Sequence, residues 1–228
     1  MYILCFRSKE LSLRIDTGRF LPTWGVVKRA LHISLPMGLQ QTIMCSAYVM
    51  TTIIIAPLGT FAIAANSFGI IIESLCYMPG YGIADAATTL VGQSMGAGRY
   101  ELMKRFAWLS VGLGVTVMAV MGVVMYVGAP VAMAMMTPAE EVRRLGVEVL
   151  RIEAFAEPMF AAAIVSYGVF VGAAKTLVPS IMNLVSIWGV RISLAAMLAP
   201  SMGLRGVWIA MCIELCFRGL IFLVKLKF

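Results

Sequence analysis

Charged residues are scarce in this chain of 228 residues, since only 13% of them are Asp, Glu, Lys or Arg. In soluble domains about a quarter of the residues are charged. The low charged fraction of this chain and its hydrophobic fraction of 61% therefore exclude an ordinary soluble domain. The hydrophobicity also excludes a disordered chain. The chain has one histidine, and its five cysteines form no CxxC pair. No catalytic triad or metal cluster is recognisable either, so the sequence predicts no enzyme, no metal site and no organic cofactor.

In place of charge the chain has long apolar runs. A transmembrane helix needs about 20 apolar residues, and each of six runs is about that long or longer. The runs cover residues 31–56, 61–91, 106–129, 147–172, 177–198 and 206–224. The predicted fold class is an all-α polytopic membrane protein with six transmembrane helices over residues 31–228, embedded in a lipid bilayer. Residues 1–30 are predicted to be a basic connector, and its apolar start is too short for a signal peptide and is consistent with the end of a preceding span.

Prolines and glycines predict where these helices bend or end. A helix over 61–91 would be about 46 Å long, more than the about 30 Å of the hydrocarbon core, so a kink is expected at Pro79. The third and fifth helices are expected to end before Pro130 and Pro200. The glycine-rich segment 92–98 lacks the Lys-Ser/Thr of a phosphate-binding loop and follows a helix. It therefore predicts a helix C-terminus.

The distribution of basic residues predicts the orientation. With six spans both ends of the chain lie on one side of the membrane, and that side carries twelve Lys and Arg against three on the other. Cytoplasmic loops are enriched in Lys and Arg. Both termini are therefore expected in the cytoplasm, and the net positive charge is assigned to orientation and not to nucleic-acid binding.

Four charged residues within the spans are predicted to neutralise one another as a structural network. Glu157 and Arg191 lie equally far from the turn expected near Ala174, which places them at one depth. Counting from the next turn places Glu214 at nearly the same depth, and Arg218 follows it one helical turn later.

Glu73 is expected to stand apart from that network. It lies near the membrane midplane, and the residues at its depth on the first span, around 41–45, include no basic side chain. A carboxyl without a partner in low dielectric is neutral or holds a cation, which is the chemistry of an H⁺ or Na⁺ coupling site. The alternative is a protonated carboxyl hydrogen-bonded between helices. Glu153 and Asp85 are expected nearer the two membrane surfaces, where solvation is easier.

Four segments carry a resemblance to a known family. Residues 72–99, which end in VGQSMGAGR, together with 151–176, 179–195 and 204–219, resemble the carboxy-terminal lobe of multidrug and toxic compound extrusion (MATE) transporters. The resemblance implies two six-helix lobes that open alternately to each side of the membrane. It also implies a place in a bacterial plasma membrane and export of cationic or amphipathic compounds in exchange for H⁺ or Na⁺. This chain has only one such lobe, so a partner lobe or a homodimer is expected.

The sequence also departs from the family in its first span, which has no acidic residue. Phe160 stands near the position of the acid expected in the fourth span. We therefore expect Glu73 to couple the ion, and we expect five residues to line the substrate cavity: Gln41, Asn66, Tyr77, Met78 and Asn183. Two alternatives remain open: a flippase for lipid-linked oligosaccharides, and a lobe without transport activity that needs a partner.

Overall fold

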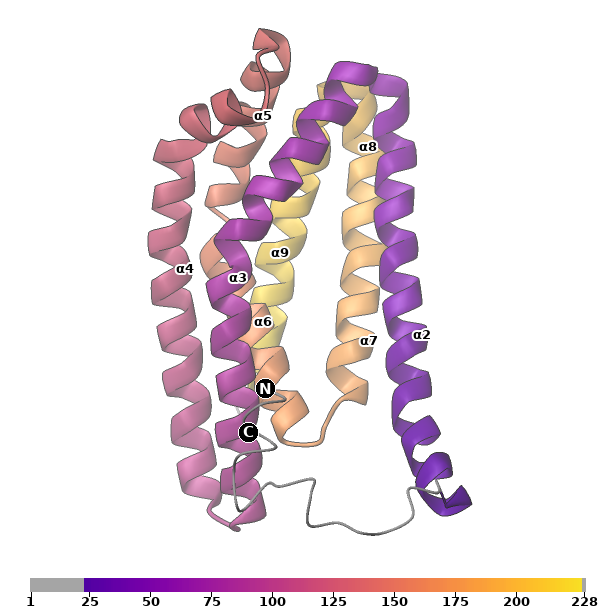
Figure 1. Ribbon diagram of the computed structural model, residues 1–228, viewed down its shortest axis with the longest axis vertical. Coiled ribbons are helices and arrows are strands. Elements are labelled where there is room, and N and C mark those ends of the chain that lie inside the picture. The colour runs from indigo at the N-terminus through magenta and orange to yellow at the C-terminus, as the bar shows by residue number, and fades with distance from the viewer. Residues whose placement is uncertain (1–22, 227–228) are drawn as a thin grey trace, which may run out of the picture. The chain divides into compact units, whose positions relative to one another are not determined.

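The computed structural model describes residues 23–226, apart from some side chains before residue 41. Within this range the chain forms helices joined by short turns, without a strand (Figure 1). In chain order they are α2 (Trp24–Ile55), the 3-10 turn η1 (Ala56–Leu58), α3 (Thr60–Gly96), α4 (Tyr100–Met136), α5 (Glu140–Ala154), α6 (Glu157–Gly172), α7 (Leu177–Val185), the π-helix η2 (Ser186–Ile192), α8 (Ser193–Met202) and α9 (Leu204–Leu226). The predicted all-α fold is confirmed.

The helices provide up to six membrane spans. Five spans are long and apolar enough on their own, with α7, η2 and α8 forming one of them. The helices α5 and α6 qualify together as the sixth, although the chain bends by 58° between them. Large apolar side chains such as Leu113, Val123 and Val127 are exposed on α4, as expected for a surface that contacts lipid. The chain is therefore a multi-pass membrane protein.

Contacts divide the chain into two units, and the boundary lies inside α2. In the described part of the first unit, Met1–Gln41, the helix exposes Trp24, Leu35 and Leu39. The first helix begins at Trp24, earlier than the predicted residue 31. Most of the predicted connector, residues 1–22, lies outside the described residues, so that prediction stays open. The second unit, Thr42–Phe228, contains the other helices and every site discussed below.

Prolines lie inside three helices of the second unit. The helices α3 and α4 each have 37 residues, and at 1.5 Å per residue each is about 55 Å long. Pro79 lies within α3, and Figure 1 shows that this helix bends, in agreement with the predicted kink. Pro130 and Pro200 lie inside α4 and α8, so the predicted helix ends before them are wrong. A proline removes one helical hydrogen bond, and packing against neighbouring helices makes that loss tolerable in a membrane.

The turn after α3 has the geometry that the glycine-rich segment predicts. Gly98 has a φ of +70°, which favours glycine. Its N–H donates to the carbonyl of Met95 at 2.9 Å, and the N–H of Arg99 donates to the carbonyl of Ser94 at 3.0 Å. This is the Schellman arrangement of a helix C-terminus, so the interpretation of this segment as a helix end is confirmed.

The fourth span differs from its prediction as one apolar run over 147–172. It begins earlier and breaks between α5 and α6. The N–H of Ala156 donates to the carbonyl of Glu153 at 2.8 Å, a tighter turn than that of an α-helix. Pro158 then stands in the first turn of α6, where its fixed φ suits a helix start. The break places Glu153 and Glu157 inside the helix bundle.

Small residues allow the helices to approach one another closely. Thr88 Oγ1 on α3 donates to the carbonyl of Gly168 on α6 at 2.9 Å. A Cβ added at Gly168 would lie 2.6 Å from the carbonyl oxygen of Ala84. Such close backbone contacts hold helices together in membranes, where the hydrophobic effect between helices is weak. They hold α6 against α3, and α6 also packs against α4.

Gly122 gives a test of this packing. A Cβ there would lie 2.7 Å from the carbonyl oxygen of Ala154, next to the break. We expect Gly122→Ala to lower the free energy of unfolding by about 1–3 kcal/mol through overpacking. Gly128 lies on the same helix with nothing within 4 Å of its added Cβ, so Gly128→Ala is the control and should be neutral or stabilising. Thermal unfolding in detergent measures both, and equal midpoints would contradict the close contact.

Candidate functional site

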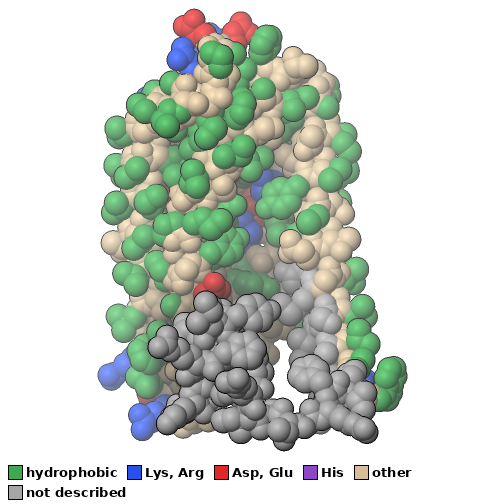
Figure 2. Space-filling model, in the orientation of Figure 1, with side chains coloured by type: hydrophobic (Ala, Val, Ile, Leu, Met, Phe, Trp, Pro, Cys, Tyr) green, Lys and Arg blue, Asp and Glu red, His purple; other side chains and the backbone are tan. Residues whose placement is uncertain are grey.

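Six charged side chains meet inside the second unit, midway along the helices. The carboxyls are Glu73 on α3, Glu153 on α5, Glu157 on α6 and Glu214 on α9, and all four are buried. The guanidinium groups are those of Arg191 on η2 and Arg218 on α9. Figure 2 shows acidic and basic side chains in a recess between apolar side chains at mid-height, while most other charged side chains in this view lie towards the two ends. We call these six residues the buried charge cluster.

Glu73 is the member of this cluster that α3 contributes, and it is 7% exposed. Among the described residues it takes part in no ion pair. The charges of Arg191 and Arg218 act on its carboxyl at longer range. The sequence correctly predicts that this carboxyl has no ion-pair partner. The expectation that no basic group lies near its level is wrong. It considered only the first span, whereas the two arginines lie on η2 and α9.

The break between α5 and α6 contributes two further carboxyls. Glu153 and Glu157 are each 1% exposed. None of their four oxygens has a hydrogen-bond partner among the described residues. The charge of Glu73 acts on both of them. Glu153 was expected near a membrane surface, where solvation is easier. That prediction is wrong, because Glu153 is buried inside the protein.

The fourth carboxyl, Glu214, is partnered. Its Oε1 lies 3.1 Å from Arg218 Nε in an i,i+4 ion pair and accepts a hydrogen bond from Ser186 Oγ at 2.6 Å. The predicted Glu214–Arg218 pair is therefore confirmed. The Arg218 guanidinium also lies over the ring of Phe160, 5.6 Å from its centroid. This part of the cluster joins η2, α6 and α9.

Arg191 does not form the predicted lock with Glu157. No described ion pair joins the two residues, and Arg191 Nε has no hydrogen-bond partner among the described residues. Its Nη2 lies 2.6 Å from Met211 Sδ, and its guanidinium lies 5.9 Å from the ring centroid of Tyr48. The prediction counted residues along regular α-helices, whereas Arg191 lies in the π-helix and Glu157 follows a break. Both irregularities rotate side chains away from the counted positions.

A small cavity of about 60 Å³ lies beside the cluster, between α2, α3, η2 and α9. Arg191, Tyr48 and Thr51 line one part of it, and Asn66 and Trp208 line another. Trp208 Nε1 donates to Asn66 Oδ1 at 3.1 Å. The space is large enough for a water molecule next to the guanidinium.

The predicted cavity wall is brought together only in part. Asn66 lines the cavity just described. Tyr77 packs edge-on against Phe160, with 5.7 Å between ring centroids. Met78 is 60% exposed, and Asn183 is half-buried on α7. Gln41 belongs to the first unit, so the structure does not place it against the others. A shared substrate cavity stays a prediction.

Glu153 is the member of the cluster that the sequence analysis leaves out of the site. Counting along an unbroken helix placed it near the membrane surface. Pro158 gives the signal for the break, because proline disfavours a helical conformation in the residue before it and is common in the first turn of a helix.

Comparison with known proteins gives consistent matches. The MatE family model matches residues 36–197. The probable multidrug resistance protein NorM of Xylella fastidiosa (strain Temecula1) is 29% identical over 88% of this chain and 43% of its own length. The probable multidrug resistance protein NorM of Thermotoga maritima is 27% identical over 94% of this chain and 46% of its own length. That of Brucella suis biovar 1 is 30% identical over 84% of this chain and 42% of its own length. The chain spans about half the length of the curated relatives it matches.

Solved structures show the same fold. A crystal structure of a MATE protein in complex with MaL6 is similar with a TM-score of 0.86 at 18% identity, over 99% of this chain and 52% of that one. The MATE transporter ClbM in complex with Rb⁺ is similar with a TM-score of 0.80 at 23% identity, over 90% of this chain and 48% of that one. The fold is therefore that of one half of these transporters.

Proposed function

Because the chain belongs to the MatE family, we propose that it forms one lobe of a multidrug efflux antiporter. Its substrates in this proposal are cationic or amphipathic small molecules, exported in exchange for H⁺ or Na⁺. Relatives described as multidrug resistance proteins are about twice as long as this chain. A second six-helix lobe, either a partner chain or a second copy, would complete the transporter.

The excess of carboxyls in the buried charge cluster carries this proposal. Four buried carboxyls stand against two guanidinium groups, and only Glu214 and Arg218 form an ion pair. An ionised carboxyl buried without a partner costs several kcal/mol. The carboxyls in excess therefore hold protons or a bound cation in the folded protein, which supports a site where an ion is taken up and released.

Glu73 is the coupling residue in this proposal. It lies on α3, where the charges of the two arginines act on it and its own charge acts on Glu153 and Glu157, the two carboxyls without hydrogen bonds. When Glu73 loses its proton or cation, its negative charge is attracted towards η2 and α9, which carry Arg191 and Arg218. A change of ion occupancy thus changes the forces between helices, as a conformational switch requires. The structural neighbour ClbM, which is in complex with Rb⁺, adds support for cation binding in this fold.

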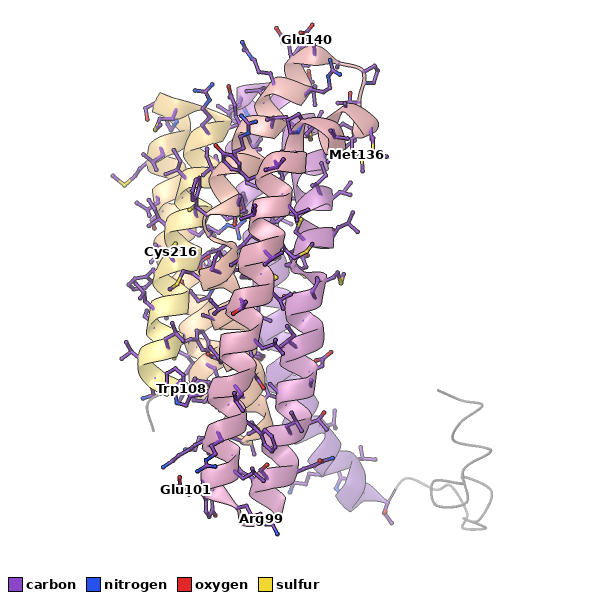
Figure 3. All side chains as sticks on the ribbon, turned by 90° about the vertical axis from the view of Figure 1, so that its left-hand side faces the viewer. Arg99, Glu101, Trp108, Met136, Glu140 and Cys216 are labelled. Atoms are coloured by element: carbon purple, nitrogen blue, oxygen red, sulfur yellow. The ribbon has the colours of Figure 1, made fainter. Side chains whose placement is uncertain are left out.

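The proposed orientation places the Arg99 end of the second unit in the cytoplasm. Arg99, Lys104 and Arg105 lie at this end, and no acidic residue except Glu101 stands among them in the chain. At the opposite end Arg143 and Arg144 are close in sequence to acidic residues, including Glu140. Figure 3 shows Arg99 and Glu101 at one end and Met136 and Glu140 at the other. The asymmetry supports the positive-inside orientation for the lobe.

The flippase alternative is less well supported by the charges of the cluster. A site for a lipid pyrophosphate needs basic groups in excess, because phosphate recognition relies on Arg and Lys. The cluster has more carboxyls than guanidinium groups, and Arg218 is engaged by Glu214. This balance favours a cationic substrate over an anionic one.

Gradient-driven transport of ethidium, a cationic amphipathic dye, tests the proposed function. The purified chain and a tandem fusion of two copies are reconstituted into vesicles, and a pH or Na⁺ gradient is imposed. We expect ethidium to accumulate against its gradient with at least one of the two forms, and to leak back when an ionophore collapses the gradient. Vesicles without protein are the control. Dye movement that ignores both gradients would contradict coupled efflux. No movement with either form would contradict a transporter built from copies of this chain alone.

A further inference from the structure

A second recess lies beside the α5–α6 break, and none of the six residues of the buried charge cluster lines it. It has a volume of about 330 Å³ and opens on the surface between α4, α5 and α9. Its apolar wall includes Ile209, Cys212 and Ile213 from α9. Its other side carries Tyr126, Arg151 and Phe155. We call it the break recess.

Arg151 brings a positive charge to the break recess. It lies in the last turn of α5 and is exposed. Its guanidinium lies 5.2 Å from the ring centroid of Tyr126, and Phe155, which is 72% exposed, packs edge-on against the same ring. Glu148, three residues earlier, is engaged by Arg205 at 2.6 Å. No described ion pair includes Arg151, so its charge is available to a ligand.

Two aromatic residues on α4 give the level of the recess in the membrane. Trp108 and Tyr126 are 46% and 41% exposed. They lie 18 positions apart on one helix, which corresponds to about 27 Å and is close to the thickness of the hydrocarbon core. Trp and Tyr concentrate at the two membrane interfaces. Figure 3 shows Trp108 towards the Arg99 end, so Tyr126 belongs towards the opposite interface. The long side chain of an arginine beside it can extend towards the lipid phosphates.

We infer that the break recess binds an anionic phospholipid, with its phosphate on Arg151 and an acyl chain along Ile209 and Ile213. The planar guanidinium suits a phosphate because it donates two parallel hydrogen bonds. Tyr126 holds the guanidinium from below by a cation–π contact, which leaves its N–H edges open to the ligand. A lipid bound here contacts α4, α9 and the end of α5 at the break. The inference does not depend on the transported substrate.

Native mass spectrometry of the full chain in a neutral detergent, titrated with phosphatidylglycerol, tests the inference. We expect Arg151→Gln to raise the dissociation constant of the first bound lipid about fivefold, the effect of one basic residue near a lipid headgroup. Arg144 is exposed on the same face of α5, two turns earlier, and does not line the recess. Arg144→Gln removes the same charge and is expected to leave that constant unchanged.

Two further arms separate a lipid site from a nonspecific charge effect and from a protein interface. Ile213→Trp fills the recess without changing charge, and we expect it to weaken phosphatidylglycerol binding, whereas Leu113→Trp on the exposed face of α4 does not. Phosphatidylcholine, which carries the phosphate but no net charge, is expected to bind more weakly than phosphatidylglycerol. Equal affinities for Arg151→Gln and Arg144→Gln would overturn the inference. So would equal binding of the two lipids, or a dimer mass that Arg151→Gln removes, which would make the recess a protein interface.

Discussion

Glu73→Gln is expected to reduce gradient-driven ethidium transport about tenfold or more, in the range of coupling free energies between linked sites. Glutamine has nearly the same size as glutamate and keeps the hydrogen-bonding capacity of a protonated carboxyl. It cannot exchange a proton, and it cannot supply negative charge to a cation or to Arg191 and Arg218. The variant is therefore expected to bind ethidium but to lose the response to a pH or Na⁺ gradient.

Asp85→Asn is the matched control for that variant. Asp85 lies on the same helix, is exposed and takes part in no ion pair among the described residues. The substitution removes one carboxylate from α3 without touching the buried charge cluster. Its transport rate should stay close to that of the unmodified chain. If Glu73→Gln retained full gradient-driven transport while binding ethidium normally, another carboxyl of the cluster would have to couple the ion.

Glu214→Leu is expected to destabilise the second unit by about 3–5 kcal/mol, the cost of leaving one buried charge without its partner. Arg218 is 9% exposed and would lose its only ion pair among the described residues. Ser186 would also lose the acceptor of its hydrogen bond. Unfolding of the purified protein by a denaturing detergent, followed by fluorescence, measures the effect.

The double variant Glu214→Leu, Arg218→Met separates a stranded charge from a general packing defect. Replacing both members of a buried ion pair by apolar residues is often neutral or stabilising, so the double variant should recover most of the lost stability. Glu101→Gln is the control, since its pair with Lys104 is solvent-exposed and such pairs contribute about 1 kcal/mol or less. A double variant no more stable than Glu214→Leu would show that the ion pair is not the cause.

The sequence predicts the number and place of the helices well, because apolar runs of sufficient length have few other stable structures in a membrane. It predicts helix irregularities less well. Pro130 and Pro200 read as helix ends, although both lie inside helices. The π-helix at Ser186–Ile192 has no recognisable sequence signal and depends on how η2 packs against α9.

The candidate site shows how those irregularities limit prediction. Glu214 and Arg218 form the expected pair because both lie on one regular helix, where residues four apart are neighbours. Counting residues from a turn predicts that Glu157 and Arg191 pair, but the break and the π-helix change which side chains meet. The break also explains why Glu153 lies deeper than the count predicts. The midmembrane position of Glu73 is independent of these breaks, and the structure buries its carboxyl without an ion pair.

The most direct test of the account is to count the protons released when ions or substrate bind to the purified lobe. A pH indicator in weakly buffered detergent solution would report release on addition of Na⁺ or ethidium. The account predicts proton release from the unmodified chain and from Asp85→Asn, and none from Glu73→Gln. Equal proton release from the Glu73→Gln variant would contradict the claim that Glu73 carries the exchangeable ion.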